Sequence, residues 1–431
     1  MPFADLREFI TAADQIGELR TVRGADWDLE IGTITELNYE RQGPALLFDE
    51  IKDYPRGYRI LANAMDSLRR SLLALGLPVD LSMDDALQEY QRLMSAYKPV
   101  PPREVSTGPV YENVLTGRDI DLWKFPTPKW HEDDGGRYLG TGDMVIMRDP
   151  DGRRVHFGTY RVMVHDENTA GLYISPIPKY ELAGYVRGAP VELVCEEVTG
   201  LPIPASAKIA IAGEVPPPSV EARPEGPFGE WTGYYASATR PEPVIRVERL
   251  YHRNDPIILG QPPVKFAGSH PHFTLPTQAK NDRERVVKAG VEDVLDVWDL
   301  AIPGVTVVQI RQRYAGHAMK AALAASGEYM QRFVVVVDED IDPRDPNAVL
   351  WAIGTRCDPE TSLTILKGCQ SSWLDPRIPP DRKRAGDLTS SRAIINACKP
   401  FEWIKEFPKT NVASDAQRRQ VLEKWTDLFP V

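Results

Sequence analysis

Two carboxylates that could take part in catalysis lie in the segment Glu-Gly-Pro-Phe-Gly-Glu-Trp-Thr-Gly-Tyr-Tyr at residues 225–235. Glu225 and Glu230 flank a Pro-Phe-Gly turn, where glycine lets another backbone or a ligand approach closely. A carboxylate held in such a turn can bind a hard metal ion through its oxygens. The alternative is a solvated acid in a surface turn, and spacing alone favours it.

Arg161 is the second candidate, because it lies in the β-prone run Val-His-Phe-Gly-Thr-Tyr-Arg-Val-Met-Val at residues 155–164. A buried arginine needs a partner, since an unpaired buried charge is costly. That partner is either a bound carboxylate, held bidentately, or the acid of a structural salt bridge, and the sequence favours neither. His156 lies five residues earlier, so strand alternation puts it on the opposite face unless the strand bulges at Gly158.

Three histidines and one arginine complete the candidates. His270 and His272, in Gly-Ser-His-Pro-His-Phe, could move protons near neutral pH or bind a metal, although isolated loop histidines are more often solvated. For His317, at the start of a small-residue helix, we predict close helix packing. Arg392 follows Ser390-Ser391, which could cap a helix and hold a phosphate through backbone N–H groups and the guanidinium.

The residues that must position these groups fall into a β-rich centre between two α/β regions. Residues 1–107 form the first α/β region, which ends near the proline-rich segment 98–102. Its predicted elements are helices at 4–20, 66–76 and 84–97 and strands at 45–48 and 58–62.

Residues 108–275 contain short β-prone runs, with a hairpin signal at Asp149-Pro150-Asp151-Gly152, and this pattern predicts a β-barrel or sandwich. Residues 276–410 return to α/β, with a buried strand at 333–337 and a helix at 346–356. Residues 411–431 contain a charged helix at 414–428. That helix serves either in self-association or as the solvated tail of a monomer.

Composition excludes several classes of function. The 431 residues carry a formal net charge of −11 and no cluster of basic residues, so nucleic acid is not expected as a partner. No apolar run reaches the ~18 residues of a membrane span, and we expect a cytoplasmic protein without membrane contact. The four cysteines lack Cys-x-x-Cys spacing, which argues against a zinc site or a disulfide framework. Common nucleotide, hydrolase and zinc-protease motifs are also missing.

Taken together, the ordered motifs resemble the UbiD family of decarboxylases, which use prenylated flavin mononucleotide. The resemblance runs through nearly the whole chain. It rests on Asp28-Leu29-Glu30-Ile31-Gly32, Gly158-Thr159-Tyr160-Arg161, the segment 225–230, Tyr251-His252-Arg253-Asn254-Asp255-Pro256-Ile257, Tyr314-Ala315-Gly316-His317-Ala318 and Trp351-Ala352-Ile353-Gly354-Thr355-Arg356. It implies an N-terminal α/β region, a central split β-barrel that holds the cofactor, and a C-terminal α/β domain with a terminal helix.

The family also implies a chemistry and a set of partners. The expected reaction is reversible non-oxidative decarboxylation of an aromatic or heteroaromatic acid, or its conjugate, through a covalent adduct of the prenylated flavin. A flavin prenyltransferase would supply the cofactor, a divalent Mn, Mg or Fe ion and K+ would accompany it, and the enzyme would form a homodimer or homohexamer. The expected substrate is a small-molecule aromatic acid.

The resemblance assigns roles to particular residues. Arg161 would contact both cofactor and substrate carboxylate, with Thr159, Tyr160 and Arg392 also at the cofactor. Glu230 would be a catalytic group that also binds the metal.

Three departures from the family pattern alter this expectation. His156 stands where the family has an asparagine metal ligand, and it could bind a softer divalent ion. After Pro176 a few dozen family residues, with a histidine metal ligand and a phosphate-contacting loop, have no counterpart. Residues 260–275 contain no Asp or Glu, so we predict His270 or His272 as the proton donor, with a slight preference for His270. The alternative is a cofactor-free UbiD-like subunit of a multisubunit aryl carboxylase.

Overall fold

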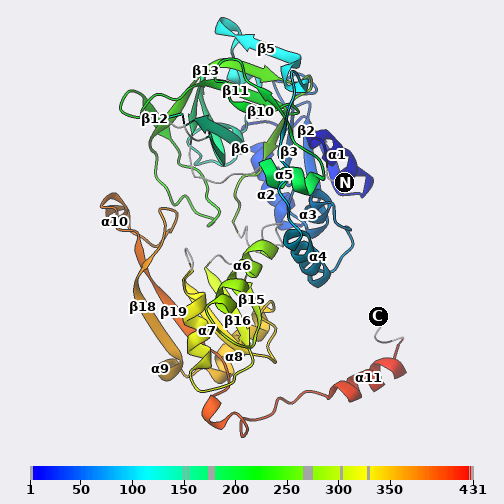
Figure 1. The fold of residues 1–431 in the computed structure, drawn as a ribbon, viewed down its shortest axis with the longest axis vertical. Coiled ribbons are helices and arrows are strands. Elements are labelled where there is room, and N and C mark those ends of the chain that lie inside the picture. The colour runs from blue at the N-terminus through cyan, green and yellow to red at the C-terminus, as the bar shows by residue number, and fades with distance from the viewer. Residues whose placement is uncertain are drawn as a thin grey trace.

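The computed structural model describes residues 3–148, 151–152, 155–172, 180–265, 275–300, 304–327, 331–426 and 428. Figure 1 shows an N-terminal and central body at one end, a C-terminal α/β body at the other, and a tail that runs outward from the second body. In the described part of the chain, no helix is long and apolar enough to cross a membrane.

The N-terminal part forms a four-stranded sheet with helices around it. The opening helix is shorter than predicted, since it ends at Gln15 and the chain turns at Gly17, where φ is +73°, into the first strand. The elements are α1 (Leu6–Gln15), β1 (Leu19–Arg23), α2 (Glu30–Glu40), β2 (Ala45–Asp49), β3 (Arg59–Ala62), α3 (Leu68–Leu75) and α4 (Met83–Ser95). The sheet order is β1-β2-β3-β14, so its last strand, β14 (Ile257–Gly260), comes from much later in the chain.

The central part is an open half-barrel with the path β11-β13-β8-β7-β6, to which β5 and β12 add through β13. Strands β6 and β7 form the predicted hairpin, with Arg148 opposite Val155 at its end. The barrel elements are β5 (Asn113–Thr116), β6 (Arg137–Arg148), β7 (Val155–Asp166), β8 (Thr169–Leu172), β11 (Ile209–Glu214), β12 (Ala222–Glu225) and β13 (Arg240–His252). Beside it lie β4 (Arg103–Glu104), β9 (Glu192–Cys195), β10 (Pro202–Pro204), helix α5 (Tyr180–Arg187) and three short 3-10 turns, η1 (Pro109–Glu112), η2 (Gly117–Asp119) and η3 (Leu122–Lys124).

The C-terminal part is a five-stranded sheet in the order β15-β16-β17-β19-β18. The predicted strand at 333–337 and helix at 346–356 are confirmed as β17 (Phe333–Asp338) and α8 (Pro346–Arg356). The other elements are α6 (Leu275–Lys288), β15 (Val294–Asp299), β16 (Val305–Ile310), α7 (His317–Ala325), α9 (Pro359–Ser362), β18 (Leu363–Gln370), α10 (Pro380–Arg384), β19 (Thr389–Asn396), η4 (Phe401–Trp403) and α11 (Asp415–Lys424).

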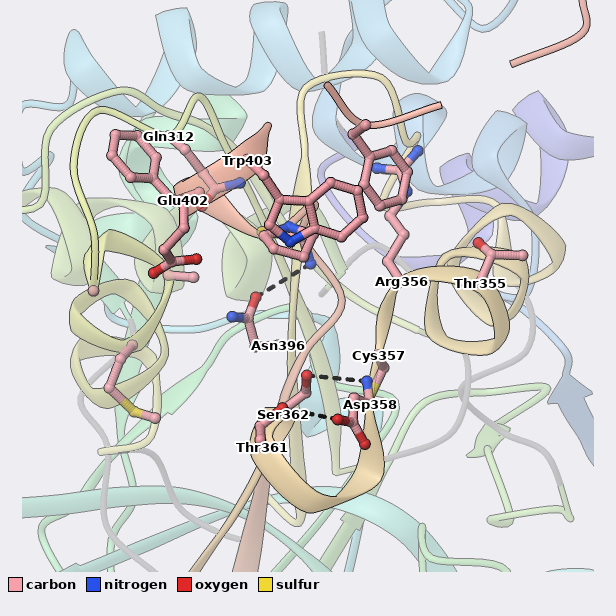
Figure 2. Close-up of a pocket in the computed structure, with 17 residues that line it drawn as sticks. Gln312, Thr355, Arg356, Cys357, Asp358, Thr361, Ser362, Asn396, Glu402 and Trp403 are labelled. Carbon is pink, nitrogen blue, oxygen red and sulfur yellow. Dashed lines mark hydrogen bonds between the residues drawn. The ribbon is translucent and has the colours of Figure 1, made fainter. Parts of the chain in front are cut away.

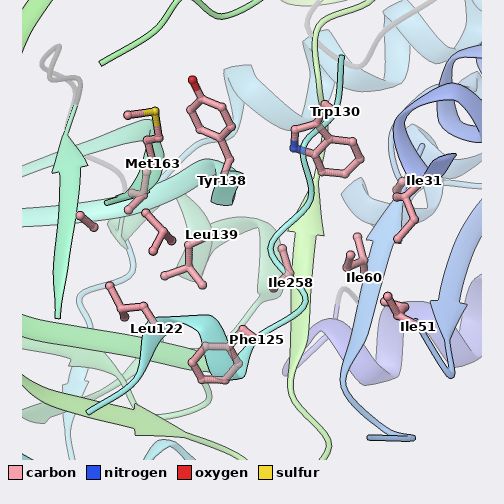
Figure 3. Packing of buried hydrophobic residues seen from close by; sticks show 14 of the residues in the cluster. Ile31, Ile51, Ile60, Leu122, Phe125, Trp130, Tyr138, Leu139, Met163 and Ile258 are labelled. Atoms are coloured by element: carbon pink, nitrogen blue, oxygen red, sulfur yellow. The ribbon is translucent and has the colours of Figure 1, made fainter. Parts of the chain in front are cut away.

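One hydrophobic cluster joins the N-terminal sheet to the half-barrel. Ile31 and Ile60 come from the N-terminal part, Tyr138 comes from β6, and Ile258 comes from β14, with Trp130 between them (Figure 3). These side chains are at most 3% exposed. The half-barrel is therefore held against the N-terminal sheet by a shared core. The expected combination of α/β regions with a split barrel is confirmed.

Asp5 ties the start of the chain to the half-barrel. Its carboxylate caps α1 by accepting from the backbone N–H groups of Arg7 and Glu8, and it pairs with Lys208 at 2.6 Å and with Arg253. Burial alone would raise the pKa of Asp5, but the hydrogen bonds from Lys208 and Arg253 outweigh it and hold that pKa well below its ordinary value of 3.8. Asp5 therefore stabilises the fold as an anion.

We expect Asp5→Asn to lower the free energy of unfolding at pH 7 by about 2 kcal/mol. This cost is smaller than that of removing one partner of a buried ion pair outright, because asparagine still caps the helix. Since the folded pKa of Asp5 is depressed, its contribution is complete above pH 3.8 and is lost as the pH falls below that value. Urea unfolding at pH 7 and pH 3 measures the difference, with Asp14→Asn on the exposed side of α1 as control. An equal loss at both pH values would contradict the assignment.

Candidate active site

Strand β7 divides the predicted site residues between its two faces. Arg161 is 7% exposed, and the ring of His156 stacks on Tyr160, with Nε2 2.9 Å from the tyrosine hydroxyl. His156 and Tyr160 are four residues apart, so they share the face opposite Arg161. The register of β7 shifts at two places, opposite residues 138–143 of β6 and near Asp166 at the end of β7. Gly158 lies at neither place, so the strand does not bulge there. The predicted opposite placement of His156 and Arg161 is confirmed.

The partner of Arg161 is the pair of glutamates at residues 225 and 230. Arg161 binds Glu225 bidentately, through Nε to Oε1 at 2.7 Å and Nη2 to Oε2 at 2.8 Å. Its Nη1 donates to Oε1 of Glu230 at 2.7 Å. Glu225 is 2% exposed and Glu230 8% exposed, so the interpretation of these residues as solvated turn acids was wrong. The salt bridge, one of the two partners left open for Arg161, is what the structure contains.

A turn at the end of β12 brings the two glutamates together. Gly226 has φ +81°, the Gly226–Pro227 bond is cis, and the guanidinium of Arg161 lies 4.9 Å from the ring centre of Phe228. The segment at residues 131–138 covers this turn, with the backbone N–H of Gly135 donating to Pro227 at 2.8 Å. A Cβ atom on Gly135 would lie 2.0 Å from the carbonyl oxygen of Gly226, so only glycine allows this approach.

The two glutamates differ in how their oxygens are used. Both oxygens of Glu225 accept from Arg161. In Glu230 only Oε1 is engaged, by Arg161 and, at 3.4 Å, by Ser237, while Oε2 has no partner among the described residues. Two carboxyl groups therefore share one guanidinium. Glu230 is therefore the group of this cluster that is placed to hold a proton or contact a ligand.

Electrostatics keep the arginine charged. Burial alone lowers the pKa of Arg161, but hydrogen bonds and charge from Glu225 and Glu230 outweigh it and raise that pKa above its ordinary value. Burial also raises the pKa of Tyr138, whose ring packs 4.5 Å from Phe228 and whose hydroxyl has no partner among the described residues. The cluster thus combines a fixed cation with a neutral, buried hydroxyl.

The described residues do not fit the metal centre that the resemblance implies. No group of three or more His, Cys, Asp or Glu side chains in the described ranges is arranged to hold a metal ion. Of the two predicted ligands, Glu230 lies in the arginine cluster and His156 lies on the other face of β7 beside Tyr160. A divalent ion at Glu230 would also lie next to the positive guanidinium of Arg161.

The remaining candidates lie elsewhere. Thr159 is exposed on β7, and His270 and His272 lie outside the described residues. Ser390, Ser391 and Arg392 belong to strand β19 rather than a helix start, so the prediction of a helix cap with a phosphate site was wrong. The guanidinium of Arg392 instead donates to the backbone carbonyls of Ser326 and, at 3.1 Å, Gln370.

His317 matches the predicted packing role. It is fully buried, its Nδ1 accepts from the backbone of Arg313 at 3.2 Å, and burial lowers its pKa. A cavity of about 650 Å³ lies in the same C-terminal part, beside Asn396, Trp403 and Arg356 (Figure 2). Arg356 already binds the carboxylates of Asp338 and Asp340 at 3.0 and 2.8 Å, so its charge is used in the fold.

Sequence reasoning missed the segment that covers the turn. Asp134 accepts from the backbone of His131 at 3.0 Å and from the hydroxyl of Tyr235 at 3.2 Å, which fixes residues 131–138 against the loop after Glu230. The signal that could have revealed it is the pair Gly135-Gly136 after two aspartates, because adjacent glycines permit close backbone approach.

Comparisons with known proteins fit this arrangement. Models of the 3-octaprenyl-4-hydroxybenzoate carboxy-lyase match in all three parts: the N-terminal domain at residues 10–90, the Rift-related domain at 103–178 and 174–265, and the C-terminal domain at 282–397. The chain belongs to the UbiD family of carboxy-lyases. Its curated relatives include a pyrrole-2-carboxylic acid decarboxylase of Pseudomonas aeruginosa, 29% identical over 98% of both chains, and a phenolic acid decarboxylase of Bacillus subtilis, 28% identical over 88% of this chain and 90% of the relative.

Solved UbiD-class structures share the fold. HmfF from Pelotomaculum thermopropionicum, in complex with FMN, is 25% identical in sequence and has a TM-score of 0.80. The superposition covers 97% of this chain and 99% of the HmfF chain. The vanillic acid decarboxylase of Sedimentibacter hydroxybenzoicus has a TM-score of 0.81 at 24% identity, over 99% of this chain and all of that chain.

Two comparisons bear on the predicted deletion in this UbiD-family enzyme. The Rift-related domain matches in two pieces that meet at residues 174–178. The alignment with the Pseudomonas relative spans 493 positions, more than the 431 residues of this chain. Both observations agree with the predicted deletion after Pro176.

Proposed function

We propose that this UbiD-family enzyme catalyses the reversible non-oxidative decarboxylation of an aromatic or heteroaromatic carboxylic acid. The observation that carries the proposal is the buried cluster of Arg161, Glu225 and Glu230, which joins a fixed positive charge to a carboxyl group with one unengaged oxygen. The names of the relatives support the substrate class, since they act on pyrrole-2-carboxylic and phenolic acids.

Each residue of the cluster has a distinct role in this proposal. In this proposal Glu230 takes up a proton when the substrate binds, so that Nη1 of Arg161 can turn from Glu230 to the substrate carboxylate, while Glu225 fixes the guanidinium by its bidentate contact. Glu230 returns a proton to the ring carbon after CO₂ leaves, because its Oε2 lies beside the arginine without another partner among the described residues. Phe228 and Tyr138 keep bulk water from the cluster. His270 and His272 stay the competing candidates for the proton donor.

We propose prenylated FMN as the cofactor, supported by the FMN in one solved relative and the prenylated FMN in an evolved dimeric form of the same enzyme. Buried polar atoms near Glu230 without described partners, Tyr138 Oη and Thr232 Oγ1, fit a polar ligand at this place. Thr159 and Arg161, which share one face of β7, would hold it together with the backbone of Tyr160 between them. When bound, the modified flavin supplies an electron sink for the sp² carbanion that CO₂ loss would otherwise leave.

The test is anaerobic purification after co-expression with a flavin prenyltransferase, followed by a visible spectrum, metal analysis and a screen of aromatic acids that includes pyrrole-2-carboxylate and hydroxybenzoates. Bound flavin and CO₂ release from at least one acid are the expected results. A colourless protein that turns over no aromatic acid would contradict the proposal.

The second candidate is a cofactor-free subunit of a multisubunit aryl carboxylase. The observation that favours it is the division of the Rift-related match at residues 174–178, where the predicted deletion after Pro176 would remove family contacts to the cofactor phosphate. Under this alternative the protein stays colourless and copurifies with a second UbiD-like chain when both are expressed together.

We further propose that the enzyme self-associates through the tail. Helix α11 extends away from the C-terminal body (Figure 1), and Val421, Leu422 and Trp425 are between 46% and 52% exposed. Removing residues 411–431 should convert a dimer or hexamer into a monomer, because these apolar side chains would lose their contacts in the partner copy. Light scattering measures the mass, with Glu423→Ser as a control against Trp425→Ser. An unchanged mass after truncation would contradict this role.

A further inference from the structure

The half-barrel encloses a cavity of about 670 Å³ that is separate from the arginine cluster. Val162 of β7 lines this cavity, whereas its neighbour Arg161 points to the other face of the same strand, as alternation requires. The charged residues Arg148, Glu196, Lys208 and Glu214 also line the cavity, but most of its walls are aliphatic side chains from six further strands. They include Val145, Leu172, Ile209, Ile211, Ile245 and Ile258.

This cavity lies close in sequence to the point where the Rift-related match is divided into two pieces. Leu172 ends β8 and lines the cavity, and the two pieces of the Rift-related match meet a few residues later, at 174–178. Strands β6 and β11 are the two ends of the sheet path, so the barrel stays open between them. Protein interiors are normally packed with few voids larger than a water molecule. An aliphatic space of this size is therefore unusual for a barrel core.

One polar group lines the cavity without a partner. Asp143 is on β6, and its Oδ2 is buried with no hydrogen bond to any described residue. Its carboxyl lies against the backbone of Gly140, where a Cβ atom would come within 2.0 Å of Oδ1. Burial alone raises the pKa of Asp143 to about 7. A buried acceptor without a donor costs free energy, which a bound donor would recover.

We propose that the half-barrel cavity binds an apolar small molecule that carries one hydrogen-bond donor, which it presents to Asp143. The volume lies within the range of roughly 300–1,000 Å³ that is typical of small-molecule sites. The aliphatic walls suit the apolar body, and the single unpartnered carboxyl fixes its orientation. This site does not depend on the proposed decarboxylase chemistry, because the cavity and Arg161 lie on opposite faces of β7.

The probe that tests this site is N-phenyl-1-naphthylamine, an apolar diarylamine with one N–H donor. Its fluorescence rises in apolar surroundings. Titration of the full-length protein should show saturable binding of one molecule per chain. Ile211→Trp fills the cavity and should weaken binding at least tenfold, with Ile211→Phe as a milder variant if the first does not fold. Ile365→Trp, on the exposed edge strand β18, is the matched control and should bind as the wild type does.

Asp143→Asn separates the polar contact from the apolar one. It should weaken the amine about tenfold and leave naphthalene, which has no donor, unchanged when naphthalene is measured by displacement of the probe. The absence of saturable binding, or binding that both Ile211 variants leave unchanged, would overturn the proposal. A cavity that a second copy of the chain already covers would also give no binding and would overturn it.

Discussion

Replacing Glu230 by glutamine should lower the decarboxylation rate about 10²- to 10⁴-fold, the usual contribution of a positioned proton donor. Glutamine has the same size and can still accept from Nη1 of Arg161, so the cluster keeps its shape. It cannot release a proton to the ring carbon. The measurement is the rate of CO₂ release under saturating substrate, together with the incorporation of solvent deuterium at the ring carbon of the decarboxylated product.

Glu132→Gln is the matched control, because Glu132 is an exposed acid of the segment at residues 131–138. It should retain full activity. His270→Gln and His272→Gln complete the comparison: a large loss in one of these, with Glu230→Gln still active, would assign the proton donor to that histidine instead.

Replacing Arg161 by methionine should lower the free energy of unfolding by about 3–5 kcal/mol, the cost of leaving a buried charge without its partner. Glu225 is 2% exposed and receives two hydrogen bonds from this guanidinium, so no water can substitute for it. Urea unfolding at pH 7 measures the loss. The double variant Arg161→Met with Glu225→Gln should recover part of it, since it removes the charge of Glu225 and leaves only Glu230 without the guanidinium.

An exposed pair of the same residue types provides the contrast. Arg246 binds Glu221 at 2.6 Å, but its side chain is 52% exposed, so Arg246→Met should cost less than about 1 kcal/mol. A double variant at Arg161 and Glu225 that is no more stable than Arg161→Met alone would show that the loss comes from packing rather than from the stranded charge.

The parts of the fold that could be predicted are those that local sequence specifies. The valine run at 333–337 predicted a buried strand, and Asp345-Pro346, a capping residue before a first-turn proline, marks the start of α8. Residues 390–392 were misread because two serines resemble a helix cap. In the structure, Ile394 and Ile395 pair with both neighbouring strands, and tertiary packing overrides the cap signal.

For the site, the sequence predicted that Arg161 needs a partner but could not identify it. Glu225 lies 64 residues further along the chain, and only the pairing of β12 with β13 and the turn after it bring the carboxylate to the guanidinium. The burial of Glu230 was missed for the same reason, since the covering segment at 131–138 is also distant in sequence. Neighbours this remote leave no local periodicity.

The late arrival of β14 in the N-terminal sheet has a consequence for biosynthesis. Its pairing with β3 places Ile257 opposite Arg59, so it closes a loop of almost 200 residues. At synthesis rates of roughly 5–20 residues per second, the edge of β3 waits about 10 to 40 s on the ribosome before its partner strand emerges. During that interval Ile60 and Leu61 lack the neighbours that bury them, and an exposed apolar edge invites aggregation. We therefore expect the emergence of β14 from the ribosome, rather than any local helix formation, to determine when the N-terminal part of this enzyme becomes native.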